Sequence, residues 1–437
     1  MDLENNNLEN ENIDNNLENN NAESNIENNE NNDNNENREN NSEEGNRFYR
    51  SDRRHYYNRE DKDGVSKLAK KIRENSPNAK KVMIVYGSDR IKTNGLFNKV
   101  VDNLKSAEID YVELGGVKPN PRLSKVYEGI EICKKQPIDF IIAIGGGSVI
   151  DTAKAVGCGA KYNGDVWDFF NGKAPTDTIK VCSILTIPAA GSETSLSCVV
   201  TNEEGWLKKS INNDAIRPVF AILDPELTYS LPKYQIGAGV FDMLSHVMER
   251  YFTNTEHVDL TDRMCEAVMK TIINYGPKTY AEPDNYQYRS EIMWAGSIAH
   301  NGLLNTGREQ DWASHRIGME LSGIYDTTHG ASLAIITPHW MEYVYKHNID
   351  RFVQWAENVW DVKLSHDDKD AIVKEGINRL VAWSKSIGMP TTLSEANIPF
   401  DRFEEMADKC TTQDKVPVGH FVPMYKKDVM AIYELSK

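Results

Sequence analysis

Residues 139–148 of this 437-residue chain read Asp139-Phe140-Ile141-Ile142-Ala143-Ile144-Gly145-Gly146-Gly147-Ser148. The apolar run predicts a buried strand, and the glycines after it predict a tight turn into a helix over Val149–Val156. Backbone N–H groups at such a helix N-terminus can bind phosphate, because the helix dipole favours an anion and glycine has no Cβ to obstruct it. The pattern departs from the G-x-G-x-x-G fingerprint of dinucleotide-binding turns. By itself the stretch therefore fits a phosphate site and a plain strand–helix turn equally well.

Segments of the same kind flank this stretch on both sides. Continuous apolar runs alternate with segments of helical periodicity, which is typical of a parallel sheet covered by helices on both faces. The expected strands are Lys81–Tyr86, Tyr111–Leu114, Asp139–Ile144, Ile184–Ile187 and Val219–Leu223, and the expected helices include Ser66–Glu74, Leu96–Leu104 and Leu123–Lys135. A second turn of small residues, Pro188 to Ser195, follows one of these strands. Because open α/β sheets bind ligands at the carboxyl ends of their strands, the two turns favour a nucleotide crevice there.

The character of the sequence changes after Asp224-Pro225. From Ile236 onward, long helical periodicities replace the β-branched runs, for example over Phe241–Arg250, Leu260–Tyr275 and Trp312–Leu321. We therefore predict three parts: a disordered tail at residues 1–46, an α/β dinucleotide-binding domain at residues 47–227, and an all-helical metal and substrate domain at residues 228–437.

The predicted tail is rich in Asn and Glu and has almost no apolar residues, so it cannot bury enough surface to offset the entropy of ordering. Its first 45 residues hold 14 of the 66 acidic side chains and one of the 50 basic ones, a net charge of −13 out of −16, which leaves −3 for the remainder. A nearly neutral remainder offers no basic face for nucleic acid. No apolar run reaches the roughly 18 residues of a membrane span, and the N-terminus lacks a signal-peptide pattern. Six scattered cysteines without a C-x-x-C pair indicate a reduced, cytoplasmic compartment.

Candidate metal ligands lie in the helical part. Asp242 and His246 are four residues apart, so their side chains project from one face of a helix. His315 lies in another apolar helix, and His329 begins the segment His329-Gly330-Ala331. One carboxylate and three imidazoles on facing helices would suit a divalent metal with room for a substrate oxygen. A single helical histidine is more often packed than bound to metal, and the chain has ten, so spacing alone does not single out these four.

Three stretches resemble the signatures of the iron-containing (group III) alcohol dehydrogenases. They are Asp242-Met243-Leu244-Ser245-His246, Gln310-Asp311-Trp312-Ala313-Ser314-His315 and Asp326-Thr327-Thr328-His329-Gly330. The resemblance covers about residues 65–437, and the chain is most similar to the butanol-dehydrogenase-like branch. It is specific, because the 14-residue separation between His315 and His329 occurs together with both turns of small residues.

The resemblance implies both a fold and a reaction. The fold is an α/β nucleotide-binding domain with a parallel sheet followed by an all-α metal-binding domain, as in the dehydroquinate-synthase-like proteins. The reaction is hydride transfer between NAD(P)H and a small primary alcohol or aldehyde, such as butanol or butyraldehyde. The implied metal ligands, catalytic through the metal, are Asp242, His246, His315 and His329, and the implied metal is Fe²⁺, although Zn²⁺ suits the same donors. The implied pyrophosphate turn is Gly146, Gly147 and Ser148, and further cofactor contacts fall on Asn120, Asp151, Thr186, Ser192, Ser195 and Lys208.

The chain departs from the family's pattern at three places. Four residues after His315, where many relatives carry a further histidine that can relay protons, it has Met319. Where NADP-using relatives read Tyr-Gly-Gly-Gly-Ser, it has Tyr86-Gly87-Ser88-Asp89-Arg90. The family's opening apolar strand is replaced by the charged segment Phe48–Tyr57, which leaves open whether two subunits pair into a homodimer through it.

The second departure bears on the choice of cofactor. A carboxylate at Asp89 can accept hydrogen bonds from both ribose hydroxyls and repels a 2′-phosphate, so NAD is expected over NADP. If Arg90 faced the ribose instead, it would pair with the phosphate and the preference would invert.

Other functions remain compatible with the sequence. Polyol oxidation of the glycerol dehydrogenase kind and a cyclase related to dehydroquinate synthase both use the same scaffold. The cyclase would need several basic residues for an anionic substrate, and Arg316 is the positive residue expected near the metal set. A non-catalytic partner protein with the acidic tail as its interaction element is a third interpretation, against which the complete ligand set argues.

Overall fold

The computed structural model describes residues 48–50 and 64–437, so the predicted disordered tail at residues 1–46 lies outside the described residues. The described residues belong to one compact unit, and the description below concerns this unit alone.

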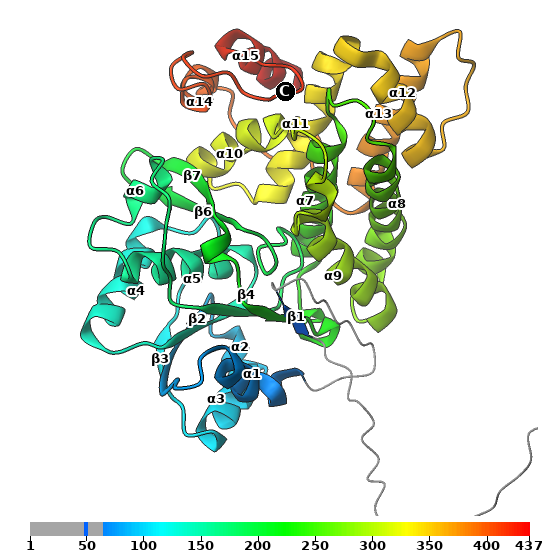
Figure 1. The fold of residues 1–437 in the computed structure, drawn as a ribbon. Coiled ribbons are helices and arrows are strands. Elements are labelled where there is room, and N and C mark those ends of the chain that lie inside the picture. The colour runs from blue at the N-terminus through cyan, green and yellow to red at the C-terminus, as the bar shows by residue number, and fades with distance from the viewer. Residues whose placement is uncertain (1–47, 51–63) are drawn as a thin grey trace, which may run out of the picture. The chain divides into compact units, whose positions relative to one another are not determined.

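A six-stranded sheet forms the first half of the unit (Figure 1). The strand order is β1-β8-β5-β4-β2-β3, with bounds Phe48–Arg50 (β1), Phe220–Ile222 (β8), Val181–Leu185 (β5), Phe140–Gly145 (β4), Lys81–Tyr86 (β2) and Asp110–Leu114 (β3). The five strands from β8 to β3 are parallel, whereas β1 pairs antiparallel with β8 at the edge. The chain passes from β2 to β3 and then returns to β4 on the other side of β2. The topological switch point, where such sheets bind ligands, therefore lies between β2 and β4.

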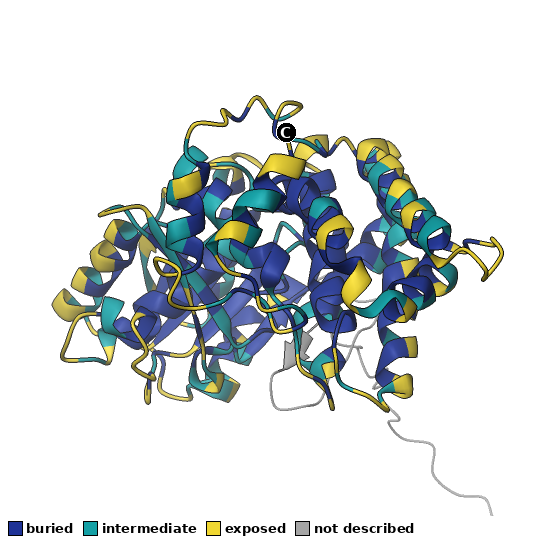
Figure 2. Cartoon of the chain, turned by 90° about the horizontal axis from the view of Figure 1, so that it is seen from above, coloured by how far each residue is buried: buried dark blue, intermediate teal, exposed yellow. Residues whose placement is uncertain are grey.

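Side chains of the central strands alternate between two apolar cores. Val82 and Ile84 of β2 pack in the core that contains α1 and α3, whereas Met83 and Val85 pack in the core that contains α4 and α5. The elements around the sheet are η1 (Gly64–Lys67), α1 (Leu68–Asn75), α2 (Arg90–Thr93), α3 (Leu96–Ser106), α4 (Leu123–Lys135), α5 (Gly147–Ala160) and α6 (Trp167–Phe170). The central strands β2, β4, β5 and β8 are buried, and Figure 2 shows that exposed residues lie on the outer faces of the helices. The predicted parallel sheet with helices on both faces is confirmed.

An antiparallel hairpin that the sequence did not indicate follows β5. Its strands are β6 (Ser197–Asn202) and β7 (Leu207–Asn212). Cys198 and Val200 of β6 and Ile211 of β7 join the apolar core that contains α5. The position of β5 also differs from the prediction, because it ends at Leu185, and Thr186 and Ile187 already belong to the turn.

The second half of the unit is helical. The short η2 (Asp214–Ile216) lies before β8 and still belongs to the first half. The elements of the second half are η3 (Pro225–Thr228), α7 (Lys233–Tyr251), α8 (Asp259–Ala281), α9 (Tyr286–His300), η4 (Leu303–Asn305), α10 (Ala313–Tyr325), α11 (His329–Val344), η5 (Tyr345–Asn348), α12 (Ile349–Trp360), α13 (Lys369–Ser386), α14 (Phe403–Cys410) and α15 (Lys426–Leu435). α7 is buried from Ile236 to Tyr251 and contributes to the main apolar core of this half. The predicted helical segments lie within α7, α8 and α10, apart from Trp312, which is the N-cap of α10.

The predicted change from α/β to helical structure falls between β8 and α7. Its use as a domain boundary at residue 227 stays a prediction, because both halves belong to one compact unit. Within the described residues, no helix is both long and apolar enough to cross a membrane. All six cysteines are free thiols.

Candidate active site

Two helices that carry candidate metal ligands touch through their backbones. A Cβ at Gly330, the second residue of α11, would lie 1.9 Å from the carbonyl oxygen of Ala238 in α7. This approach brings His329, at the start of α11, next to Asp242, which lies one turn after Ala238 on α7. Small residues at these positions therefore determine how close the two candidate ligands lie.

Asp242, His315 and His329 form a group whose ligand atoms all lie within 4.8 Å of one another. Oδ1 of Asp242 is 3.7 Å from Nε2 of His315 and 3.8 Å from Nε2 of His329. These distances are too long for hydrogen bonds, and both Oδ1 of Asp242 and Nε2 of His315 are buried without a hydrogen-bond partner. Ligands about 2.1 Å from a tetrahedral ion lie about 3.4 Å apart, so the spacing fits donors that share one cation. The residues present therefore fit a divalent metal.

His246 lies beside this group rather than within it. Its Nδ1 is 3.6 Å from Oδ1 of Asp242 on the same helix and has no hydrogen-bond partner. The ring is 4.5 Å from the ring of His315, centroid to centroid. Burial lowers the pKa of His246 and of His329 well below the ordinary value, so both rings are neutral and keep a lone pair for a cation.

Glu249, which the sequence did not indicate, orients His315. Its Oε1 accepts a hydrogen bond from the backbone N–H of His315 at 2.8 Å and one from Nδ1 at 2.9 Å. Because Nδ1 carries the proton, the lone pair of His315 is on Nε2, which faces Asp242. Glu249 is seven residues after Asp242, two helical turns further along the same face, so the spacing could have identified it.

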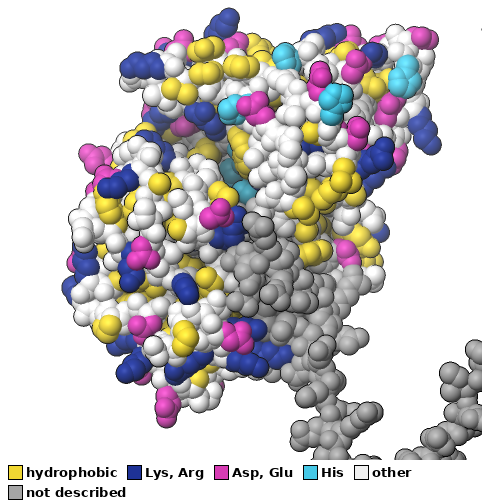
Figure 3. Space-filling view, viewed as in Figure 1, with side chains coloured by type: hydrophobic (Ala, Val, Ile, Leu, Met, Phe, Trp, Pro, Cys, Tyr) yellow, Lys and Arg dark blue, Asp and Glu magenta, His cyan; other side chains and the backbone are white. Residues whose placement is uncertain are grey.

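Aromatic rings and a buried cation border the group. The ring of Trp312, whose φ is +65°, lies 5.0 Å from that of His315, and the guanidinium of Arg250 lies 4.7 Å from the Trp312 ring. His300 stacks at an angle on His246, with centroids 4.3 Å apart, and its Nδ1 donates a hydrogen bond to the carbonyl of Ala190 at 2.8 Å. Histidine side chains are visible at the bottom of a hollow in the surface (Figure 3).

The expectation for Arg316 is wrong. Its guanidinium donates to the carbonyl oxygens of Cys410 and Pro417 instead of facing the metal group, because the side chain extends toward α14. The cations that act on the group are the partly buried Lys208, whose charge acts on Asp242, and the buried Arg250, whose charge acts on His246.

The glycine turn lies directly before α5, as the sequence predicts. Gly147 is the first residue of α5, and its N-cap, Gly146, provides no side-chain hydrogen bond to the helix end. A Cβ at Gly146 would lie 2.8 Å from Cβ of Ile187, and a Cβ at Gly147 would lie 3.1 Å from Cβ of Ala190. The absence of side chains at both glycines thus lets the second turn, residues 186–196, lie against the first.

Other predicted cofactor residues gather around these two turns. Oδ1 of Asp151 accepts a hydrogen bond from the hydroxyl of Ser192 at 2.6 Å, and its Oδ2 accepts one from the backbone N–H of Val199 at 3.0 Å. The N–H of Thr186 donates to the carbonyl of Gly145. The hydroxyl of Ser195 accepts from the N–H of Ser197. Asp151 thus links α5 to Ser192 of the second turn, and Thr186 links the start of that turn to the end of β4.

Asn120 and Lys208 join the two halves of the unit. Nζ of Lys208, on β7, donates to Oδ1 of Asn120 at 2.9 Å, and Nδ2 of Asn120 donates to Oδ1 of Asp326, between α10 and α11, at 2.9 Å. Arg122 also pairs with Asp326 at 2.9 Å. Burial lowers the pKa of Lys208 to about 8.

Asp89 lies apart from these residues, in the turn after β2. Its side chain is 76% exposed and lies 3.5 Å from Nζ of Lys92, which also pairs with Glu113 at 2.7 Å. Arg90 is exposed as well. Both residues therefore lie at the carboxyl end of β2 with exposed side chains.

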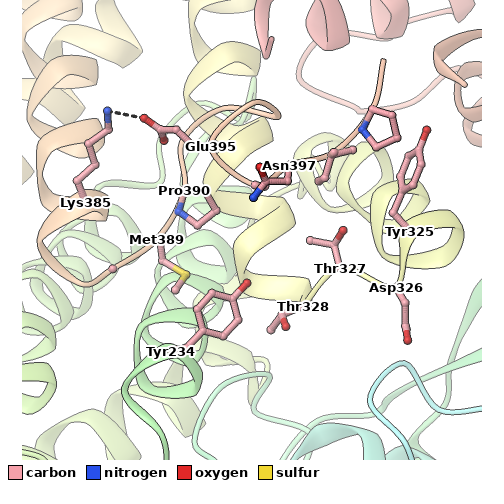
Figure 4. A pocket seen from close by; sticks show the side chains of 14 residues that line it. Tyr234, Tyr325, Asp326, Thr327, Thr328, Lys385, Met389, Pro390, Glu395 and Asn397 are labelled. Atoms are coloured by element: carbon pink, nitrogen blue, oxygen red, sulfur yellow. Dashed lines mark ion pairs between the residues drawn. The ribbon is translucent and has the colours of Figure 1, made fainter. Parts of the chain in front are cut away.

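A cavity of about 770 Å³ opens nearby (Figure 4). Tyr234, Tyr325 and Thr328 are among the residues that line it. Its lining includes none of the predicted metal ligands or cofactor contacts, so we do not assign the substrate to it.

Comparison with known proteins agrees with this geometry. Residues 60–225 match the family model described as iron-containing alcohol dehydrogenase, and residues 236–436 match that of the C-terminal part of the Fe-containing alcohol dehydrogenase family. The chain is 39% identical over 358 residues to NADH-dependent butanol dehydrogenase A of Clostridium acetobutylicum, covering 82% of this chain and 92% of the relative. It is 35% identical over 375 residues to an NADPH-dependent aldehyde reductase of Escherichia coli, covering 84% and 95%. The crystal structure of NADH-dependent butanol dehydrogenase A from Thermotoga maritima superposes with a TM-score of 0.82 at 35% identity, covering 86% and 95%.

Proposed function

The chain belongs to the iron-containing alcohol dehydrogenase family, whose members are NAD(P)-dependent oxidoreductases, and from this premise we propose its reaction. The proposed reaction is the reversible reduction of a small aldehyde such as butyraldehyde to the primary alcohol, with NADH as the hydride donor. The observation that carries it is the group formed by Asp242, His315 and His329, whose donor atoms face one another without hydrogen bonds.

We propose that Asp242, His246, His315 and His329 hold one divalent metal. When bound, such an ion polarises the carbonyl of an aldehyde and lowers the pKa of an alcohol. A carboxylate with imidazoles suits Fe²⁺ and Zn²⁺ alike, and family membership favours Fe²⁺. Glu249 keeps His315 in the tautomer that can bind the ion.

The side chains around the group support a small, largely apolar substrate. Trp312 and His300 present aromatic surface beside His246, and their rings lie 5.6 Å apart. Such surface favours an alkyl group over a polyol, whose hydroxyls would need hydrogen-bond partners. Glycerol-type oxidation therefore stays the alternative.

We propose NADH as the preferred cofactor, held by Gly146, Gly147, Ser148, Asn120, Asp151, Thr186, Ser192, Ser195 and Lys208. The N–H groups at the start of α5 would bind the pyrophosphate. Asp89 supports NAD, because its exposed carboxylate would repel a 2′-phosphate. The butanol dehydrogenase of C. acetobutylicum is described as NADH-dependent, which is in line with this choice.

We keep two further predictions. Six unpaired cysteines suit a reduced, cytoplasmic compartment. A homodimer would pair through β1, because β1 is an edge strand of the sheet.

The proposal is tested by following NADH oxidation with butyraldehyde, before and after removal of the metal by a chelator. We expect turnover that the chelator abolishes and that Fe²⁺ or Zn²⁺ restores. Equal or faster oxidation of glycerol with NAD⁺ would favour the alternative. Turnover that withstands complete metal removal would contradict the metal-dependent reaction.

A further inference from the structure

Lys154 of α5 is a charged side chain with no solvent exposure. Its Nζ donates three hydrogen bonds: to the hydroxyl of Ser192 at 2.9 Å, to the carbonyl of Ser195 at 3.0 Å and to the carbonyl of Ser197 at 2.7 Å. Burying an ammonium is costly unless all its protons are bonded, and here all three are. Because a neutral side chain would be less costly to bury, we look for a function that depends on the three hydrogen bonds of this ammonium.

All three acceptors belong to the end of the second turn and the start of β6. Ser192 accepts from Lys154 and donates its only hydroxyl proton to Oδ1 of Asp151. The hydroxyl of Ser192 is therefore fixed in direction, and it separates the ammonium from the carboxylate. Burial raises the pKa of Asp151 and lowers that of Lys154, so each group depends on the other's charge through this hydroxyl.

The turn that Lys154 supports lies between the two parts of the active site. On one side, a Cβ at Gly147 of the first turn would lie 3.1 Å from Cβ of Ala190. On the other side, a Cβ at Gly239 of α7 would lie 2.4 Å from the carbonyl of Pro188, and His300 donates to the carbonyl of Ala190. Gly239 precedes Asp242 by three residues on α7. The turn thus bridges the start of α5 and the metal group.

A dinucleotide that spans these two places must cross the turn. Its pyrophosphate would bind at the start of α5, and its hydride-transferring carbon has to reach the metal group. The nicotinamide ring would therefore lie against residues 188–195, which separate the start of α5 from the metal group. The position of that surface decides the alignment of the ring with the substrate, and a displacement of about 1 Å can cost about 100-fold in rate.

We infer that Lys154 is a positioning residue for the nicotinamide ring, which holds the Ser192–Ser197 segment from beneath and thereby aligns the ring with the metal group. The inference rests on the proposed nicotinamide-dependent reaction. It assigns to Lys154 no contact with the substrate and no part in binding the adenosine or the pyrophosphate.

The test compares two ligands that differ in the nicotinamide half. ADP-ribose contains the adenosine and the pyrophosphate without the nicotinamide, whereas NADH contains all three. For Lys154→Met we expect the Kd of NADH to rise about tenfold and kcat to fall about 100-fold, while the Kd of ADP-ribose stays within about twofold of the wild-type value. Lys161→Met, at the exposed C-terminal end of the same helix, is the matched control and should change neither affinity.

A second variant covers the case in which Lys154→Met does not fold. Lys154→Gln keeps an amide that can donate to two of the three acceptors, so it should give the same selective loss of NADH affinity at smaller size. Equal weakening of NADH and ADP-ribose would overturn the inference, and so would unchanged kcat in a folded Lys154→Met protein. A wild-type protein that does not react with NADH would instead contradict the proposed function.

Discussion

Oε1 of Glu249 accepts two hydrogen bonds from His315, one from its backbone N–H and one from its ring Nδ1. The carboxylate thereby fixes the ring and makes Nε2 a stronger donor toward a metal. Replacing Glu249 by Gln removes the negative charge with little change in shape. We expect the metal affinity to fall about 10- to 100-fold, which a competition titration with a chromogenic chelator would measure. Glu256→Gln, which changes an exposed carboxylate just after α7, should leave the affinity unaltered, and an unaltered affinity in Glu249→Gln would contradict the role.

A second prediction concerns the four proposed ligands. His329→Ala should abolish bound metal and activity while the circular dichroism spectrum stays that of the wild type, because His329 begins α11 and is only half buried. We expect His246→Ala to lose metal as well. His300→Ala is the matched control: its ring contacts that of His246, but Nδ1 donates to the carbonyl of Ala190, so bound metal should be retained. Stoichiometric metal in His246→Ala would reduce the set to Asp242, His315 and His329.

A third prediction concerns the cofactor. Asp89→Gly removes a carboxylate from the turn after β2 and should raise kcat/KM with NADPH relative to NADH by about tenfold or more, because the like-charge repulsion of the 2′-phosphate is lost. The wild-type protein should prefer NADH. Steady-state kinetics with both cofactors measure the ratio. A ratio unchanged by the substitution, or a wild-type preference for NADPH, would assign the ribose contact to another residue, with Arg90 as the first candidate.

A fourth prediction concerns the pH dependence of stability. Burial raises the pKa of Glu320 on α10 to about 7, against the lowering effect of the charges of Lys409, Lys208 and Arg316. A carboxyl with a raised folded-state pKa stabilises the fold at acidic pH, and that contribution is lost as pH rises through about 7. Glu320→Gln should therefore melt about 3 °C above the wild type at pH 8 and by a smaller margin at pH 5. Glu342→Gln, on an exposed position of α11, should show no such difference, and an equal margin at both pH values would refute the assignment.

The sequence predicts those parts of the fold whose signal is local. β2 and α4 have the expected bounds, because a continuous apolar run or an uninterrupted helical period identifies each. β5 begins three residues and ends two residues before the predicted strand, because Ile187 is apolar for a different reason: it lies against Gly146 in the neighbouring turn. β6 and β7 were missed because β7 is mostly polar and only Ile211 in it is buried.

In the site, too, residues related by local spacing can be predicted from the sequence, whereas residues brought together by packing cannot. Helical spacing relates Asp242 to His246, and it would have related Glu249 to both, but an acidic residue in a helix usually faces solvent. Nothing local links His315 or His329 to Asp242; only the resemblance to a family placed them together. The contacts of Arg250 with Trp312 and of Lys154 with Ser195 depend on how distant segments pack, and no periodicity records them.

The backbone contact between Gly330 and Ala238 limits how this enzyme can change during evolution. Any side chain at residue 330 would have to displace α7 from α11 by about 1 Å or more, since its Cβ would lie 1.9 Å from a carbonyl oxygen. That displacement would also separate His329 from Asp242. A wider site for larger substrates therefore cannot arise by moving α7 away from α11, because the two proposed metal ligands would no longer lie close enough to share an ion. Adaptation to bulkier aldehydes has to proceed through side chains that line the site but do not determine the distance between α7 and α11. Trp312 is such a side chain, and variants should accumulate there first.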